Sequence, residues 1–228
     1  MLPIETLDVD GAIREADEAA VGDTRAVFFR KAAVGGGAVL TSGAIMGMLP
    51  ELAAARPSKK QDIAILNYAY TLELLESDFY DKAIASGALS GDTLAFAQLV
   101  AKHEAIHVTA LRKTIKALGG RPVKSPKFDF GDATTDQAKF QETSFVLENT
   151  GIHAYLGQVA RIKQKPVLKA AGSIITIEAR HAAAIAVILN QSPFQDKNEK
   201  SGVTPEGAFD TPLSMKAVLK AAGGFIKS

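Results

Sequence analysis

The sequence predicts an all-α protein built on a four-helix bundle, with a long crossover between the second and third helices. Three observations support this prediction. Four long stretches after residue 58 have apolar residues at helical spacing, two of the three connections between them are short, and each stretch places a glutamate on its apolar face. Two short connections around one long one are typical of a bundle whose middle link crosses from one end to the other.

The composition is that of a globular protein that can bury one sizeable core. The chain has 228 residues, of which 47% are hydrophobic and 22% are charged, and its formal net charge is +1. It has no run of lysine and arginine with interleaved aromatic residues, so nothing supports a nucleic-acid partner. Because the chain contains no cysteine, any metal must be held by nitrogen and oxygen ligands.

Residues 1–55 differ from the rest of the chain and resemble a twin-arginine export signal. Basic residues at 25, 30 and 31 precede an apolar, glycine-rich stretch over 32–49, and three alanines at 53–55 give a small-residue cleavage site. Two departures from the usual pattern are Ala26, which stands where the second arginine belongs, and seven acids among the first 24 residues. We interpret this segment as a leader and expect an exported, periplasmic protein. A membrane-anchored or cytoplasmic protein that keeps the segment is the alternative.

Boundary signals divide the remaining chain into a bundle over residues 56–190 and a tail over 191–228. Gly87 ends the first predicted helix, Asp92 is the expected N-cap of the second, and Pro166 lies in the first turn of the fourth. The tail contains an amphipathic run over 213–226 that is expected to pack on the bundle. The first predicted helix spans residues 60–86, the second starts after Asp92 and ends at the glycines at 119–120, the third spans 136–163, and the fourth has Pro166 in its first turn and ends near residue 190.

Each predicted helix carries ionisable side chains on the face that would form the core. Burying one unpaired carboxylate costs several kcal/mol, and four buried together would also repel one another. Two divalent cations would balance four carboxylates, so this arrangement indicates a two-metal site. The residues are Glu73 on the first helix, Glu104 and His107 on the second, Glu148 on the third, and Glu178 and His181 on the fourth.

The spacing within this set fits metal ligands. In both ExxH motifs the acid and the imidazole are three residues apart, so they project from the same helix face. One glutamate from each of two helices and one ExxH motif from each of the other two form the ligand set of di-iron and di-manganese bundles. Tyr80 and Tyr155 each follow a core glutamate by seven residues. They are expected to hydrogen-bond a ligand or donate an electron, with a plain core role as the alternative.

Four neighbouring polar residues are interpreted without a metal role. Glu76 lies one turn from Glu73 but off the apolar face, so a solvent-facing side chain is expected, and a ligand in place of Glu73 is the alternative. His103 and His153 are interpreted as surface or satisfied core histidines, and Glu142 as a charge on a helix face.

The segments around these residues also resemble a known family. The chain resembles bacterial ferritin-like domain proteins, which are related to plant desiccation-associated proteins. The segments that carry the resemblance are LNYAYTLELLESDFY at 66–80, HEAIH at 103–107, LENTGIHAYLG at 147–157, IEARHAA at 177–183 and FDTPLS at 209–214. The connecting segment over 128–132 is similar as well. The resemblance covers residue 60 to the C terminus and implies a ferritin-like four-helix bundle. It implies metal ligands at Glu73, Glu104, His107, Glu148, Glu178 and His181.

The expected function is redox chemistry at a di-iron centre, with manganese as the alternative metal. A ferroxidase- or peroxidase-like oxidoreductase acting on oxygen or peroxide in stress protection fits this centre. A manganese-catalase-like enzyme and a non-enzymatic stress or structural bundle, whose metal only stabilises the fold, remain open as alternatives. The expected partners are metal ions, a homo-oligomer is left open, and membrane contact is expected only if the leader is uncleaved.

Overall fold

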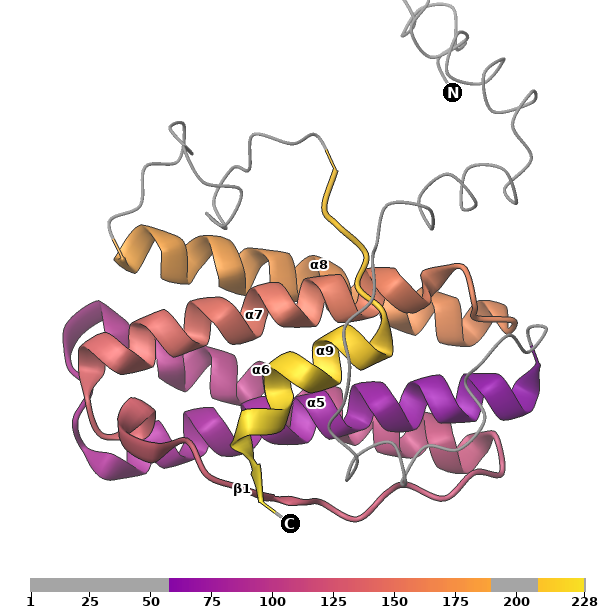
Figure 1. The fold of residues 1–228 in the computed structure, drawn as a ribbon, viewed down its shortest axis with the longest axis horizontal. Coiled ribbons are helices and arrows are strands. Elements are labelled where there is room, and N and C mark those ends of the chain that lie inside the picture. The colour runs from indigo at the N-terminus through magenta and orange to yellow at the C-terminus, as the bar shows by residue number, and fades with distance from the viewer. Residues whose placement is uncertain (1–57, 190–208, 228) are drawn as a thin grey trace, which may run out of the picture. The chain divides into compact units, whose positions relative to one another are not determined.

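The computed structural model of the chain describes residues 58–189 and 209–227. The leader predicted over residues 1–55 lies outside the described residues, so cleavage, export and periplasmic localisation stay predictions. Residues 191–208 of the predicted tail also lie outside them. Within the described residues, four long helices form a bundle against which a short helix lies (Figure 1). The predicted all-α fold class is confirmed.

The bundle consists of two helix pairs joined by a long crossover. Helix α5 packs along α6 and α7 packs along α8, and only short connections, residues 87–90 and 160–164, separate the members of each pair. Residues 118–136 form the crossover that links the pairs, as predicted (Figure 1). The helices are α5 (Lys59–Ser86), α6 (Gly91–Ala117), α7 (Gln137–Val159) and α8 (Lys165–Ile188).

Capping explains where the first two helices begin and end. The Ser58 side chain accepts a hydrogen bond from the backbone N–H of Gln61 at 3.1 Å, which starts α5. Gly87 ends this helix in the left-handed conformation, with φ 72°, as predicted. The prediction that Asp92 is the N-cap of α6 is wrong, because Ser90 occupies that position. Asp92 lies instead within the first helical turn, where a negative charge is favourable.

Helix α7 begins as predicted but ends earlier. The Asp136 side chain caps it by accepting a hydrogen bond from the backbone N–H of Lys139 at 2.9 Å. The helix stops at Val159 instead of residue 163. The N–H groups of Arg161 and Ile162 donate to carbonyls three residues back, and a buried carboxylate accepts from the two N–H groups that follow. Asp62 of α5 accepts hydrogen bonds from the N–H groups of Lys163 and Gln164 at 2.9 Å each. The start of α5 is thereby fastened to the connection between α7 and α8.

Helix α8 is the most apolar helix of the bundle. It is long and apolar enough to cross a membrane by length and composition, a test that the core helix of a soluble protein also passes. Here it packs on α7 and α6 and carries Glu178 and His181 into the core. Pro166 lies in its first turn as predicted, and it ends at Ile188, two residues before the predicted end.

The crossover packs on α5 and pairs with the C-terminal end. Its strand β1 (Lys127–Phe128) is antiparallel to β2 (Ile226–Lys227), and the 3-10 helix η1 (Gly131–Thr134) follows. Phe79 of α5 lies against Phe130 of the crossover and Phe140 of α7, with ring centroids 5.1 Å apart in both pairs. Burial of each such ring contributes about 1.5–3 kcal/mol.

The described part of the tail lies against α7. Helix α9 (Met215–Ala222) buries one apolar face and is followed by the 3-10 helix η2 (Gly223–Phe225). The backbone N–H of Leu213 donates to the carbonyl of His153 at 3.1 Å. A Cβ at Gly157 would lie 1.8 Å from the Leu213 carbonyl oxygen, so this close contact requires glycine.

Candidate metal centre

The core of the bundle contains a cluster of carboxylates and imidazoles from all four helices. The structure brings together the six residues that the sequence identified as candidate ligands, and none of them is more than 8% exposed. Helices α6 and α8 each contribute a glutamate and a histidine one turn apart, and α5 and α7 contribute one of these glutamates each. The six are Glu73 of α5, Glu104 and His107 of α6, Glu148 of α7, and Glu178 and His181 of α8.

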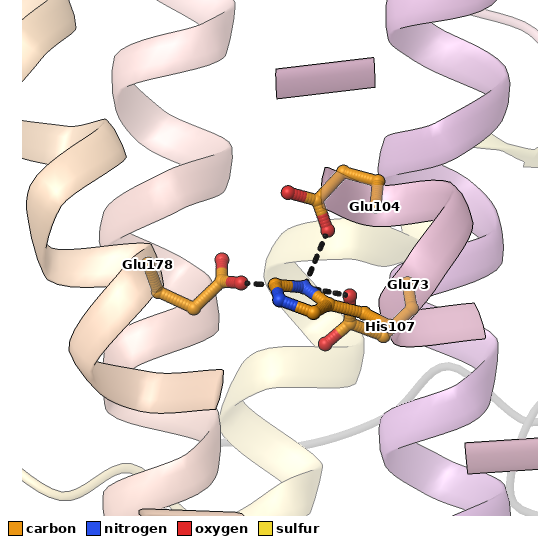
Figure 2. A group of neighbouring side chains, drawn as sticks. All are labelled: Glu73, Glu104, His107 and Glu178. Atoms are coloured by element: carbon orange, nitrogen blue, oxygen red, sulfur yellow. Dashed lines mark hydrogen bonds and ion pairs between the residues drawn. The ribbon is translucent and has the colours of Figure 1, made fainter. Parts of the chain in front are cut away.

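Half of the cluster is centred on His107. Its Nδ1 lies 3.1 Å from Glu73 Oε2, 3.1 Å from Glu104 Oε2 and 3.3 Å from Glu178 Oε1. Figure 2 shows the imidazole between the three carboxylates, with Glu178 reaching it from the opposite side of the bundle. The donor atoms of these four side chains all lie within 4.8 Å of one another, so the group could hold a metal ion.

The other half is centred on His181 and repeats this arrangement. Its Nδ1 lies 3.2 Å from Glu148 Oε2 and 3.3 Å from Glu104 Oε1. Glu104, Glu148, Glu178 and His181 form a second group whose donor atoms lie within 4.8 Å of one another. Glu104 and Glu178 belong to both groups, so two ions held here would share these two carboxylates.

Both candidate tyrosines contact the cluster. The hydroxyl of Tyr155 donates a hydrogen bond to Glu73 Oε1 at 2.5 Å, and that of Tyr80 donates to Glu148 Oε1. Tyr80 also lies 2.6 Å from the hydroxyl of Ser144. Tyr155 therefore orients Glu73 and Tyr80 orients Glu148. Each of these carboxylates belongs to only one of the two groups, so the two halves of the cluster are alike in this respect as well.

His103 contacts the cluster from its outer side, which the sequence interpretation missed. Its Nδ1 lies 2.8 Å from Nε2 of His181, the ring nitrogen that faces away from the carboxylates. A partner of this kind fixes the orientation of a ligating imidazole. The residue lies one turn before His107 and beside Glu104, and the HEAIH segment was the signal that could have identified it. His153 has no contact with the cluster among the described residues.

The expectation of a solvent-facing Glu76 is wrong. Its side chain is 4% exposed and lies next to the cluster, where burial and the charges of Glu178, Glu148, Glu104 and Glu73 raise its pKa well above the ordinary value. Helix α5 contacts α6, α7, η1 and β1, so a wider arc of it is buried than one apolar stripe. Glu76 is thus a fifth carboxylate at the cluster, beside the four of the predicted set.

Burial raises the pKa of most of these carboxylates. It raises that of Glu73 to about 8, and the charge of Glu104 adds to the effect while the hydrogen bond from His107 opposes it. Burial and neighbouring carboxylates also raise the pKa of Glu178 well above its usual range. Without metal, part of the cluster is therefore protonated at neutral pH.

The pKa values of the two histidines and of Glu104 shift in the directions expected of ion pairs. Burial opposes the charge on His107, but the neighbouring carboxylates of Glu104 and Glu178 outweigh it and raise the pKa to about 12. The carboxylates of Glu104 and Glu148 likewise outweigh burial at His181 and raise its pKa to about 9. At Glu104, burial acts upward, but the two neighbouring imidazoles lower the pKa to about 2. Protonated imidazoles thus supply positive charge where a metal would.

Oxygen atoms that lack hydrogen bonds in the cluster fit a metal better than a self-contained polar network. Glu104 Oε1 and Glu178 Oε1 are buried with no hydrogen bond and only an imidazole nitrogen at 3.3 Å, and Glu178 Oε2 is buried with neither a hydrogen bond nor an ion pair. Orphaned buried acceptors are unusual and costly, and a cation at the shared carboxylates would satisfy them. Gly151 of α7 contributes space here, since a Cβ at this residue would lie 2.9 Å from Glu178 Oε2.

A four-helix bundle with buried carboxylates and ExxH histidines from paired helices defines the ferritin-like class of proteins. Residues 61–191, more than half of the chain, match the sequence model of the ferritin-like domain family, and the chain belongs to this family. The resemblance to ferritin-like domain proteins that the sequence showed is therefore confirmed at the level of the family. No curated protein matches the chain.

Proposed function

We propose that this chain binds two iron ions in the bundle core and uses them for redox chemistry on oxygen or peroxide in stress protection, with manganese as the alternative metal. The observation that carries the proposal is the pair of ligand groups that share Glu104 and Glu178. Each group contains three carboxylates and one imidazole, a donor set of oxygen and nitrogen that suits iron and manganese.

The side chains of the cluster have distinct parts in this proposal. Glu104 and Glu178, which belong to both groups, would be available to both ions, while Glu73 with His107 and Glu148 with His181 would each serve one of them. Tyr155 and Tyr80 hold the two non-bridging carboxylates, and burial excludes bulk water from all of them. When bound, iron would supply the electrons that reduce oxygen or a peroxide.

Anaerobic titration with iron(II), followed by exposure to air, tests the proposal. Wild-type protein is expected to bind two ions per chain, to consume oxygen and to develop the near-ultraviolet absorption of iron(III). Two matched variants, His107→Gln and His153→Gln, test whether His107 is a ligand. His107→Gln is expected to bind at most one ion, whereas the control His153→Gln is expected to bind two. No bound iron, or uptake that His107→Gln leaves unchanged, would overturn the two-metal assignment.

Activity measurements on the metal-loaded protein distinguish the competing functions. Two bound iron ions without oxygen or peroxide consumption would assign the metal a stabilising role only. Faster disproportionation of hydrogen peroxide after loading with manganese(II) than with iron(II) would replace the iron assignment by a catalase-like one. Both outcomes keep the ligand set and change the chemistry.

A further inference from the structure

Glu76 is the buried carboxylate to which the six-residue ligand set gives no role. It lies one turn after Glu73 on α5 and is almost completely buried. No hydrogen bond or ion pair of Glu76 is found among the described residues. The charges that act most strongly on it are those of other carboxylates, which repel it. An acid in such surroundings must either keep its proton or face a cation.

Gly151 of α7 marks the place where Glu76 approaches the cluster. A Cβ at this glycine would lie 3.5 Å from Glu76 Oε1 and 2.9 Å from Glu178 Oε2, so both carboxylates reach the same point on the surface of α7. Glu178 Oε2 is buried and has no hydrogen-bond partner. Two carboxylate oxygens, one of them without a hydrogen bond, thus lie near the same glycine, where a cation would offset their repulsion.

We propose that Glu76 is a further metal ligand, which binds beside Glu178 on the Gly151 side of the cluster. The centre is then held by five carboxylates and two imidazoles. This inference rests on the proposed function, because it assumes metal at the cluster. Glu76 is outside the two compact groups of four, so its side chain moves toward Glu178 when metal binds. The missing Cβ of Gly151 leaves the space for this movement.

A fifth carboxylate changes the charge balance of the centre. Four ionised carboxylates neutralise two divalent ions, and the fifth adds one negative charge. An additional negative charge in a buried site stabilises trivalent over divalent metal, so Glu76 favours the oxidised state of the centre. A structural acid that keeps its proton would have no such effect.

Cobalt(II) titration of the full-length chain tests the proposal without depending on activity. Three proteins are compared: wild type, Glu76→Gln, and Glu142→Gln as the control, because Glu142 is an exposed acid on α7. Glutamine keeps the shape of glutamate but is a poor ligand. We expect two ions per chain in each protein, at least about tenfold weaker binding in Glu76→Gln only, and a more intense visible cobalt spectrum in that variant.

The outcomes distinguish this inference from the proposed function. Wild-type affinity and an unchanged cobalt spectrum in Glu76→Gln would assign Glu76 as a protonated structural acid and overturn the inference, while the two-metal centre would stand. Failure of the wild type to bind two ions would overturn the proposed function itself. If Glu76→Gln does not fold, Glu76→Asp gives the same comparison, since its shorter side chain keeps the charge but retracts from Glu178.

Discussion

Tyr155 and Tyr80 restrict the movement of Glu73 and Glu148, the two carboxylates that each belong to only one ligand group. Both hydroxyls are buried and donate to a carboxylate oxygen, so neither Glu73 nor Glu148 can turn away without breaking a hydrogen bond. Such a hydrogen bond contributes about 0.5–1.5 kcal/mol when the acid is protonated and about 1.5–3 kcal/mol when it is charged. The two tyrosines therefore pre-organise the outer ligands before metal enters.

Tyr155→Phe is expected to weaken metal binding by about 10- to 100-fold, the usual effect of removing a group that orients a ligand. The substitution leaves one buried oxygen of Glu73 without its donor, and it retains the packing of the ring. Competition with a chelator of known affinity measures the change. Tyr70→Phe is the control, because Tyr70 is a buried tyrosine on the same helix as Glu73 but has no hydrogen bond to the cluster among the described residues. Equal losses in both variants would contradict a specific role.

The sequence predicted the six candidate ligands because each lies on the apolar stripe of its helix at a spacing that the α-helix fixes. It did not predict Glu76 or His103, because each lies beside that stripe. Whether such a residue is buried depends on what covers the flank of the helix. Here the crossover and the neighbouring helices cover α5 on several sides. Helical periodicity cannot predict this packing, because it depends on tertiary contacts.

Helix α7 approaches its neighbours through two glycines with different partners. Gly157 permits contact with the backbone at Leu213, whereas Gly151 lies against Glu178 and Glu76. A helix interior normally disfavours glycine by about 1 kcal/mol relative to alanine. The close approach at both residues offsets that cost, and at Gly151 it provides room for ligand carboxylates.

Gly151→Ala is expected to weaken metal binding by at least about tenfold, because the new Cβ would displace Glu178 Oε2 from 2.9 Å. Gly172→Ala in α8 is the matched control, since a Cβ there meets nothing within 4 Å. The control should gain up to about 1 kcal/mol of stability from helix propensity and keep its metal affinity. Metal titration and calorimetry measure both effects, and unchanged affinity in Gly151→Ala would contradict the role of the open space.

Elements were predicted well where local chemistry sets their ends. Gly87 and Pro166 act as expected, because a left-handed cap and a first-turn proline are properties of a few adjacent residues. The connection that follows α7 is bound by Asp62, which is about 100 residues away in the chain. The pairing of β1 with β2 is also a long-range contact between two-residue strands, which carry no periodic signal.

The charge balance of the whole core makes stability depend on metal and pH. Burying five carboxylates in one bundle is unfavourable unless protons or cations accompany them. Without metal, protons on the imidazoles and on some of the carboxylates provide this compensation. Metal binding must displace those protons, so we expect proton release on loading at neutral pH.

The metal-free protein is expected to lose thermal stability as pH rises from about 4.5 to about 9. Folding raises the pKa of Glu73 from 4.5 to about 8 and that of His181 from 6.5 to about 9, so the folded state binds more protons than the unfolded chain across this range. Their contribution is complete below the unfolded pKa values and is lost through the folded ones. The lowered pKa of Glu104 acts oppositely, but only below about 4.5.

Calorimetry of metal-free and loaded protein from pH 5 to pH 9 measures this dependence. The melting temperature of the metal-free form should fall over this range, while that of the loaded form should not, because metal replaces the displaced protons and binds more tightly as its ligands deprotonate. Glu148→Gln removes one like charge while retaining shape, so it should flatten the slope of the metal-free form and leave it at least as stable as wild type at pH 8. A metal-free protein that becomes more stable toward pH 9 would show that the buried acids are paired with bases instead of with one another.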